Sequence, residues 1–533
     1  MRPSQAKEHH TGGPPPAPRL VPLSGSPARA RPDGPAAGPP DAWAVTGTAP
    51  LPPGVGDARA VDEDVPAAVG RVLGHLLAER TARARAVDPL FAEDLAGRVA
   101  RFTEQGGRRM RARLLWGALR ACGGDGDAAV AAALRIGAAL ELVQTCALVH
   151  DDVMDGAALR RGRAALHVEL AEQYAGAGAG GPRGEAEHAE GAGAGAEGVG
   201  GGTEGLGADA EGLGAGVAGA SRAGRFGNAA AILAGDLALA WADDVVAETV
   251  LAPEVAAVVR RIWSDLRTEM VAGQYLDVQG QVTGASSLPR ALRAACLKSA
   301  LYSVERPLAL GAALAGADAA TLRALCSAGR CVGMAFQLRD DLDDVFGDSR
   351  RTGKPAGGDI REGKATYLVA LARARAEAAG DRDALAVLER SLGSAALSRA
   401  GLDEVREVLV RTGARDAVRT RIERLVAEGL RHLDGALLDP EGGHRLRRLL
   451  GSVAGGPGPA ASGPGDDATS AGRDATTAPG RDAVTAPGRD ATTAPGRAPD
   501  TPSAPPPVPL GPAVPPSAPV PVSLLAGTEE TRR

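Results

Sequence analysis

The sequence lacks the features that mark several large classes of protein. Its 533 residues carry a net charge of −5, so it has no basic surplus of the kind that binds nucleic acid. No uninterrupted apolar run reaches the roughly 18 residues that a membrane-spanning helix needs. The first residues, MRPSQAKEHHTGGPPPAP, contain no apolar segment of a secretory signal. We therefore expect a cytoplasmic protein that has no membrane span and binds no nucleic acid.

Cysteine is also scarce. The chain has five cysteines, and their spacing is not that of a metal site. Most of them stand in apolar segments with helical periodicity, which favours buried free thiols in a reducing compartment over disulfides. The five residues are Cys122, Cys146, Cys296, Cys326 and Cys331.

Three stretches lack the periodic apolar pattern of a folded core. Residues 1–58 and 455–533 are rich in Pro, Gly and Ala, and the tail repeats an eight-residue unit, GRDATTAP or GRDAVTAP, from Gly472. Residues 175–224 consist mostly of Gly and Ala with scattered Glu. Chains of this composition bury too little apolar surface to fold, so we expect disordered termini and a disordered internal insertion. The remainder of 59–454 is long enough for one large domain.

Aromatic residues make up only 2% of the chain, and β-branched and aromatic residues nowhere alternate in the manner of a strand. Apolar residues instead recur at helical spacing, and the helical stretches stop at Gly or Pro. The sequence therefore predicts an all-α fold, a large single-domain helical bundle. The expected helices are Val65–Ala86, Phe91–Gln105, Arg109–Cys122, Asp127–Asp155, Asn228–Leu251, Glu254–Gln279, Pro289–Ala315 and Ala319–Phe346, with shorter ones from Ala365 to about Leu450.

A charged segment, LVHDDVMDGAALRRGRAALH at residues 148–167, follows a long apolar helix. Asp151 and Asp155 are four residues apart, which places their carboxylates on one helix face, whereas Asp152 turns away by about 100°. Like charges at this spacing destabilise a helix slightly, so an unneutralised pair is a poor structural choice. Taken alone, such a pair is more often a solvated helix end than a binding site.

The same arrangement returns in FQLRDDLDDVFGD, again at the end of an apolar helix, with Asp340, Asp341 and Asp344. Two such clusters on helices of one bundle can face each other across a cavity. Mg²⁺ takes oxygen ligands at about 2.0–2.1 Å and shares them with phosphates, so paired carboxylate clusters indicate a magnesium site. Asp343 and Asp348 stand off the ligand face, and we expect them to be solvated.

Three groups of basic residues accompany the aspartates. A guanidinium binds phosphate oxygens through two hydrogen bonds and an ammonium acts as a point charge, although a single Arg or Lys is more often only solvated. Together with carboxylates that bind magnesium, these groups predict a substrate with a diphosphate leaving group. They are Arg108, Arg109, Arg111 and Arg113; Arg160, Arg161 and Arg163 with His167; and Lys298, Lys354 and Lys364.

The order of these motifs resembles that of the trans-isoprenyl diphosphate synthases, or polyprenyl synthetases, and most of all the bacterial geranylgeranyl diphosphate synthases. GGRRMRA is similar to the family's GGKRxRP, with Arg108 in place of Lys and Ala112 in place of Pro. RRGRAALH is similar to RRGxPTxH, with Ala164 and Ala165 in place of Pro-Thr. The resemblance spans nearly all of the helical region. It is completed by AGDLALAWA, GQYLD, LKSALYSVERPLALGAALAG, FQLRDDLDDVFGD and GKPAGGDIREGKAT.

The resemblance implies an isoprenoid-synthase bundle around a central cavity and an Mg²⁺-dependent prenyltransferase that works as a homodimer. Such an enzyme joins isopentenyl diphosphate to an allylic diphosphate, either dimethylallyl, geranyl or farnesyl diphosphate, and gives an all-trans polyprenyl diphosphate. Three Mg²⁺ ions are implied at each site. The ligands that the resemblance implies for these ions are Asp151, Asp155, Asp340 and Asp344, with Asp152 and Asp341 assisting.

The same resemblance assigns roles to the other polar residues. Lys298 and Lys364 neutralise the leaving diphosphate, and Lys354 also contacts substrate. Gln337 and Ser299 stabilise the allylic cation through their dipoles. The candidates for binding isopentenyl diphosphate are Arg108, Arg109, Arg111, His150 or Gln144, and Arg160 or Arg161.

Product length in this family depends on what blocks the pocket below the first aspartates. The position five before Asp151 is the small Cys146, followed by the small Ala147, which indicates an open pocket and a product beyond C20. Against this stand the likeness to geranylgeranyl diphosphate synthases and Trp116, a residue that could cap the pocket from the side. We expect C20 geranylgeranyl diphosphate, with C25 or longer, or C15, as alternatives.

Three other classes fit the sequence less well. A class I terpene cyclase would carry an Asn/Asp, Ser, Glu triad at its second metal site, where this chain has a second DDxxD. A head-to-head prenyl synthase would lack the RRG and GK segments. A non-catalytic partner subunit would be expected to have lost aspartates, and all six are present.

Overall fold

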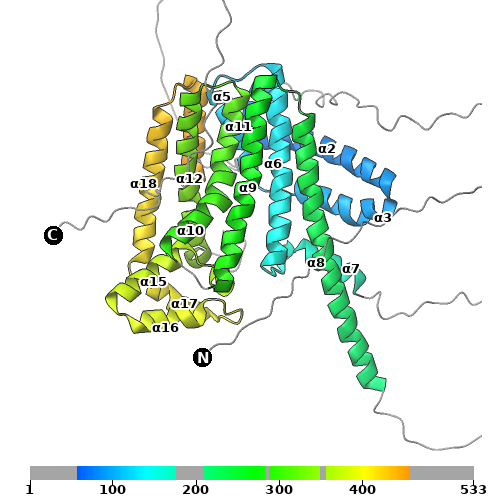
Figure 1. The fold of residues 1–533 in the computed structure, drawn as a ribbon, viewed down its shortest axis with the longest axis vertical. Coiled ribbons are helices and arrows are strands. Elements are labelled where there is room, and N and C mark those ends of the chain that lie inside the picture. The colour runs from blue at the N-terminus through cyan, green and yellow to red at the C-terminus, as the bar shows by residue number, and fades with distance from the viewer. Residues whose placement is uncertain (1–56, 176–207, 284–286, 348–355, 456–533) are drawn as a thin grey trace, which may run out of the picture. The chain divides into compact units, whose positions relative to one another are not determined.

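The computed structural model describes residues 57–175, 208–283, 287–347 and 356–455 (Figure 1). All of them fall in the larger of the two compact units of the chain, residues 50–533. Regular structure in the described ranges is helical apart from two strands of two residues each, which confirms the expected all-α class. The low-complexity stretches that we expect to be disordered lie largely outside these ranges.

The elements follow one another through short connections. Those before residue 250 are α1 (Ala58–Glu63), α2 (Val65–Val87), α3 (Pro89–Phe91), the π-helix η1 (Ala92–Ala96), α4 (Gly97–Glu104), α5 (Met110–Ala121), α6 (Asp127–Met154), β1 (Leu159–Arg160), β2 (Arg163–Ala164), α7 (Leu166–Tyr174) and α8 (Ala208–Glu248). Those after it are α9 (Pro253–Thr283), α10 (Leu288–Ala295), the π-helix η2 (Cys296–Glu305), α11 (Arg306–Leu314), α12 (Ala319–Phe346), α14 (Gly358–Arg361), α15 (Tyr367–Ala379), α16 (Arg382–Ser391), α17 (Arg399–Arg411), α18 (Ala414–Asp434) and α19 (Pro440–Val453).

Side-chain caps fix the start of several helices. The Asp64 carboxylate accepts from the backbone N–H of Ala67 in α2, and the Asp318 carboxylate accepts from that of Thr321 in α12. Such caps satisfy N–H groups that have no partner within the first helical turn. No side chain caps α6, and its stability comes from burial instead, because most of its residues are buried.

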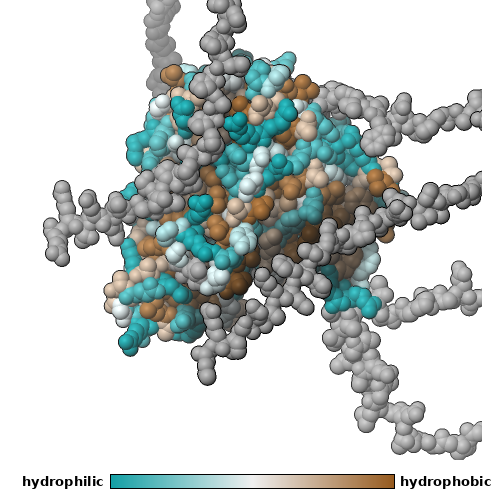
Figure 2. Space-filling view, viewed as in Figure 1, coloured by the Kyte–Doolittle hydropathy of each residue, from teal (hydrophilic) through white to brown (hydrophobic). Residues whose placement is uncertain are grey.

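The long helices pack side by side (Figure 1). α6 contacts α8, α5 and α2, while α12 contacts η2, α11 and α18. The buried apolar side chains form two clusters, one that includes α2, α6 and α8 and one that includes η2, α12 and α18. The outer surface mixes hydrophilic and hydrophobic residues (Figure 2).

The sequence predicts no membrane-spanning helix, but one described helix, α6, is long and apolar enough to be a candidate. In its most apolar window, 83% of the residues are buried inside the protein. A core helix of a bundle passes the same test of length and composition. Its burial among α2, α5 and α8 therefore accounts for the apolar character of α6.

Four elements differ from the expectation. The single helix expected over Phe91–Gln105 contains the five residues of the π-helix η1. The helix expected from Asn228 begins at Ala208, inside the expected insertion, since the many alanines there favour a helix despite the glycines. The single helix expected over Pro289–Ala315 contains the ten residues of η2, where the helix widens to π geometry. The hairpin of β1 and β2 was not expected, because two-residue strands leave no alternating pattern.

Gly273 explains how η2 is placed. A Cβ atom at Gly273 of α9 would collide with the backbone nitrogen and Cα of Lys298 in η2. Only glycine therefore allows the two backbones to approach this closely. The contact fixes the position from which the Lys298 side chain extends.

Gly273→Ala should lower the free energy of unfolding by about 1–3 kcal/mol, because the added methyl group overpacks the α9–η2 contact. Gly280→Ala is the matched control on the same helix, since a Cβ there would meet no atom within 4 Å. Alanine at that position should be neutral or stabilising by up to ~1 kcal/mol. Urea unfolding of the two variants measures the difference, and equal effects would contradict the account.

Candidate active site

The first aspartate cluster lies at the carboxyl end of α6 and is bound by side chains from three other segments. One oxygen of Asp151 accepts from Lys298 Nζ and from Gln274 Nε2, both at 3.1 Å. Its other oxygen accepts from Arg160 Nη2 at 3.2 Å. Lys298 Nζ also donates to Asp277 Oδ2 at 2.8 Å, so one ammonium group joins α6 to α9.

Lys364 joins the two aspartate clusters. Its Nζ donates to Asp155 Oδ2 at 2.8 Å and lies 3.8 Å from Asp359 Oδ1. The backbone N–H of Asp359 donates to Asp344 Oδ2 at 3.1 Å. Lys364 therefore contacts Asp155 of the first cluster directly and reaches Asp344 of the second through Asp359.

In the second cluster, Asp341 is buried and accepts from Gln337 Nε2 at 2.7 Å, one turn earlier on α12. Asp340 lies beside it on the same helix and contributes to its electrostatic environment. Asp343 is exposed, in agreement with the expectation that it is solvated. Asp348 lies outside the described residues.

The two clusters carry different charge. Burial works against ionisation of Asp151, but Lys298, Lys364 and Arg160 outweigh it and lower its pKa to about 2. Burial, with the nearby Asp340, instead raises the pKa of Asp341 to about 7. At neutral pH the ionised form of Asp151 is therefore favoured, whereas burial disfavours the ionised form of Asp341.

Two further carboxyls also have raised pKa values. Burial raises the pKa of Asp344, and burial together with Asp344 raises the pKa of Asp359. Buried carboxyls that repel one another fit a hard divalent cation such as Mg²⁺, which takes oxygen ligands and would relieve the repulsion. The residues present therefore suit a magnesium site.

The two arginine segments each contain one residue with a strained backbone. Arg161 lies at the turn of the β1–β2 hairpin with φ 54°, and Arg109 precedes α5 with φ 46°. Within the ranges described, they are the two residues other than glycine in the left-handed region. Such strain costs on the order of 1–3 kcal/mol and tends to occur at functional sites. Arg161 Nη1 donates to the carbonyl of Gln105, which holds the hairpin against the segment before α5.

Glu141 of α6 lies among these arginines. Its Oε2 is 3.9 Å from Arg109 Nη1, and both side chains are less than 10% exposed. Burial raises the pKa of Glu141, against the opposing charges of Arg111, Arg109 and Arg161. Arg109 Nη1 and Arg111 Nε are buried without a hydrogen-bond partner. Buried guanidinium donors of this kind would be satisfied by the oxygens of a bound anion.

Gln144, rather than His150, belongs to this arginine group. Arg111 donates to Ser303 Oγ at 2.7 Å and stacks on the Tyr302 ring at 4.2 Å. Tyr302 in turn donates to Gln144 Oε1 at 2.9 Å. His150 turns towards α8, where its Nε2 lies 3.0 Å from the carbonyl oxygen of Ile232.

The remaining candidates take different places. Arg160 contacts the aspartates, since its Nε donates to Asp152 Oδ1 at 2.7 Å, so Arg161 is the member of this pair nearer to Arg109. Arg108 is exposed. Ser299 is partly buried on η2, next to Lys298. Lys354 lies outside the described residues.

Cys146 and Ala147 occupy two faces of α6. Cys146 is buried, and its Sγ lies 3.7 Å from His150 Nδ1 on the side towards α8. Ala147 is one turn before Asp151 and therefore shares the face of the first aspartate.

Trp116 was expected to cap the pocket from the side, but it does not lie near Cys146. α5 and α6 are joined by a short loop and run antiparallel, with Ala112 packed against Gly137. At 1.5 Å per residue, Trp116 is displaced from Cys146 by roughly 20 Å along the helices. Its indole N–H donates to Asp62 of α1 at 2.8 Å.

Four residues of the site were not singled out from the sequence: Glu141, Gln274, Asp277 and Asp359. Asp277 closes the motif GQYLD, and Asp359 lies within GKPAGGDIREGKAT, so both segments carried a signal. Glu141 is a charged residue in an otherwise apolar stretch of α6, and this anomaly was the available clue.

Comparison with known proteins gives consistent matches. A family model described as polyprenyl synthetase matches residues 93–177 and 216–401. A geranylgeranyl diphosphate synthase of Mycobacterium tuberculosis is 32% identical over 282 residues, 52% of this chain and 62% of the relative. A farnesyl diphosphate synthase of Geobacillus stearothermophilus is 30% identical over 283 residues, 51% of this chain and 74% of the relative.

A solved structure adds to these matches. The geranylgeranyl pyrophosphate synthase of Corynebacterium glutamicum, complexed with isoprenyl diphosphate and magnesium, is 31% identical with a TM-score of 0.61. The match covers 73% of this chain and 98% of that chain. The residues that the family model matches contain both aspartate clusters and both arginine segments.

Asp341→Asn should stabilise the metal-free protein more at about pH 8 than at about pH 5.5. The pKa of Asp341 rises from 3.8 to about 7 on folding, so the folded state holds this proton more tightly than the unfolded state. Stability is therefore lost as the pH rises through that range, and asparagine, which mimics the protonated acid, avoids the loss. Melting curves in EDTA at the two pH values test this.

Asp343→Asn serves as the control, because Asp343 is an exposed aspartate of the same helix. Its melting temperature should follow that of the wild type at both pH values. If Asp341→Asn also follows the wild type, the raised pKa that burial gives Asp341 is wrong.

Proposed function

The chain belongs to the polyprenyl synthetase family, and from this premise we propose that it joins isopentenyl diphosphate to an allylic diphosphate and releases an all-trans polyprenyl diphosphate, chiefly C20 geranylgeranyl diphosphate. The observation that carries this proposal is the first aspartate cluster held by Lys298 and Lys364, with Lys364 also near Asp359 and thereby the second cluster. Arg109 and Arg111 add one buried N–H group each that has no hydrogen-bond partner. One half suits a metal-bound diphosphate and the other a second diphosphate.

Asp151, Asp155, Asp340 and Asp344 would hold Mg²⁺, with Asp152 and Asp341 supporting them. The carboxyl groups of Asp341 and Asp344, whose pKa values are raised, are the ones that a cation would ionise. When bound, Mg²⁺ would supply positive charge to the oxygens of the leaving diphosphate.

The lysines bind and orient the allylic diphosphate. Lys298 and Lys364 each lie within hydrogen-bond distance of the first aspartate cluster, so each can donate to a diphosphate that the cluster holds. Their charge stabilises the diphosphate as the carbon–oxygen bond breaks. Because these groups are already fixed by Asp277 and Asp359, little reorganisation is needed at that step.

The arginines bind isopentenyl diphosphate. Arg109, Arg111 and Arg161 surround Glu141, which balances part of their charge before the substrate arrives. The unsatisfied Nη1 of Arg109 and Nε of Arg111 would donate to its phosphate oxygens.

Gln337 would stabilise the allylic cation. Its amide nitrogen is held by Asp341, which leaves the amide oxygen as the negative end of a dipole. The new carbon–carbon bond then forms, and the released diphosphate takes up the proton that the product loses. Ser299, next to Lys298, would act in the same way as Gln337.

The small residues on α6 leave room for a growing chain. Cys146 and Ala147 put little volume below the first aspartates, and Trp116 is too distant to close the pocket at that level. This arrangement supports a product of C20 over one of C15, and C25 or longer is the alternative. The relatives named above include makers of C20 and of C15 diphosphates.

A cytoplasmic homodimer is part of the proposal. α8 exposes three large apolar side chains, Phe226, Ile232 and Leu233, that a second copy of the chain would cover. Sedimentation equilibrium tests this, because a mass of one chain at working concentration would contradict it.

Asp151→Asn should lower turnover on the order of 10²–10³-fold without unfolding the protein, because it removes a charged metal ligand while Lys298 keeps Asp277 as a partner. Asp343→Asn, the exposed neighbour of the second cluster, should be fully active. Steady-state assays with and without EDTA, followed by added Mg²⁺, measure both effects. Undiminished turnover of Asp151→Asn, or of wild type in EDTA, would rule out the metal-dependent mechanism.

Ala147→Phe should shorten the product more than Cys146→Phe does. Ala147 shares the face of Asp151, whereas Cys146 lies on the side of His150 and α8. Chromatography of products made from dimethylallyl diphosphate measures the chain length, and circular dichroism checks that both variants fold. The reverse order of effects would show that the growing chain passes on the α8 side.

A further inference from the structure

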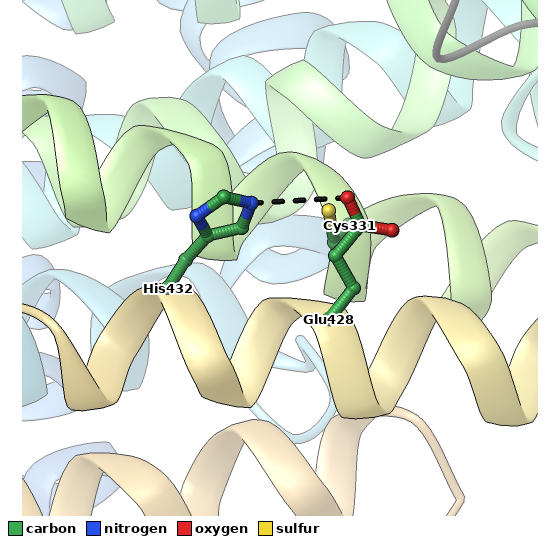
Figure 3. Close-up of side chains that lie close together, drawn as sticks. All are labelled: Cys331, Glu428 and His432. Atoms are coloured by element: carbon green, nitrogen blue, oxygen red, sulfur yellow. Dashed lines mark ion pairs between the residues drawn. The ribbon is translucent and has the colours of Figure 1, made fainter.

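A second group of metal-binding side chains lies outside the candidate active site. Cys331 of α12 and Glu428 and His432 of α18 point towards one another (Figure 3). One ligand atom from each, a sulfur, a carboxylate oxygen and a ring nitrogen, lie within 4.8 Å of one another. Cys331 precedes Asp340 by nine residues, or about 13 Å of helix, so the two groups are separate.

The packing of α12 against α18 brings these residues together. A Cβ at Gly429 would lie 2.9 Å from Val332 Cγ2 and 3.2 Å from Cys331 Cβ, so glycine allows α18 to approach α12 closely at Cys331. Glu428 and His432 are four residues apart and share one helix face. Their side chains therefore flank the thiol from adjacent turns of α18.

We propose that Cys331, Glu428 and His432 bind Zn²⁺. Thiolate, imidazole and carboxylate are the three donor types that zinc takes, and three protein ligands leave the fourth position to water. Mg²⁺ prefers oxygen donors alone, so the aspartate site and this site differ in the metal that each selects.

The geometry needs only a small adjustment. Zinc–ligand bonds of about 2.0–2.3 Å place the donor atoms of a tetrahedral site roughly 3.3–3.8 Å apart, closer than the present 4.8 Å limit. The Cys331 side chain is buried and fixed, at 4% exposure. The side chains of Glu428 and His432 are 37% and 43% exposed, so they are free to close on the metal.

Charged groups act on the thiol. His432 Nε2 lies 3.9 Å from Glu428 Oε1, and Glu428, Arg330, Glu305 and Arg431 contribute to the electrostatic environment of the sulfur. Burial, assisted by Glu428, raises the pKa of Cys331 to about 12, so the metal-free protein carries the thiol. Zinc binding exchanges the S–H bond for an S–Zn bond, and the proton goes to solvent. The bound ion would tie α12, the helix of the second aspartate cluster, to α18.

Co²⁺ titration of the full-length protein in excess Mg²⁺ tests the site. Mg²⁺ occupies the oxygen ligands of the aspartates, and a thiolate-to-cobalt charge-transfer band reports binding at sulfur alone. We expect one equivalent of Co²⁺ per chain to produce the band and Zn²⁺ to abolish it. His432→Ala, a change at a partly exposed position, should weaken binding at least tenfold, and Cys331→Ser should remove the band.

Cys326→Ser is the matched control, since Cys326 is a second free cysteine of α12 outside the three-residue group. It should keep the full band. Absence of the band in the wild type, or an unchanged band in Cys331→Ser or His432→Ala, would overturn the proposal. Zn²⁺ should also raise the melting temperature of the wild type and not that of His432→Ala.

Discussion

The crowding of carboxylates at one end of the helical bundle is the constraint on which the rest of the structure depends. Asp151, Asp155, Asp341 and Asp344 come from two helices and are at least partly buried, where unpaired negative charge is unfavourable. Lys298 and Lys364 offset part of that charge. The π geometry of η2, the close contact at Gly273 and the loop before α15 all serve to bring these two ammonium groups to the aspartates.

The arginine group has the opposite distribution of charge, with several cations around one carboxylate. Arg109, Arg111 and Arg161 converge on Glu141, as the lysines converge on the aspartates. In each case a protein group holds the charge that a substrate or cation would replace, so the polar atoms are oriented before binding. If the proposed function holds, two diphosphates bound at these groups would have their reacting ends fixed relative to each other, which would convert an encounter in solution into a step within one complex.

Local patterns were sufficient to predict the helices and the two aspartate clusters. Helical periodicity and the spacing of Asp151 and Asp155 are properties of neighbouring residues, and α12 has the bounds that the sequence predicts.

The residues that contact the aspartates are distant from them in the sequence. Lys298 reaches Asp277 across 21 positions and Lys364 reaches Asp155 across 209. Local spacing cannot predict contacts between residues so far apart in the sequence, and the contact of Cys331 with His432 is a further example. The position of Trp116 could not be predicted from the sequence either, because it depends on how α5 packs on α6.

The most direct test of the central claim is to incubate the purified protein with Mg²⁺, labelled isopentenyl diphosphate and each allylic diphosphate in turn, and to size the products by chromatography. The account predicts label in an all-trans product, mainly C20, and only when both diphosphates are present. Lack of incorporation with dimethylallyl, geranyl and farnesyl diphosphate by folded protein would contradict it, and label mainly in chains of C30 or longer would contradict the proposed C20 product.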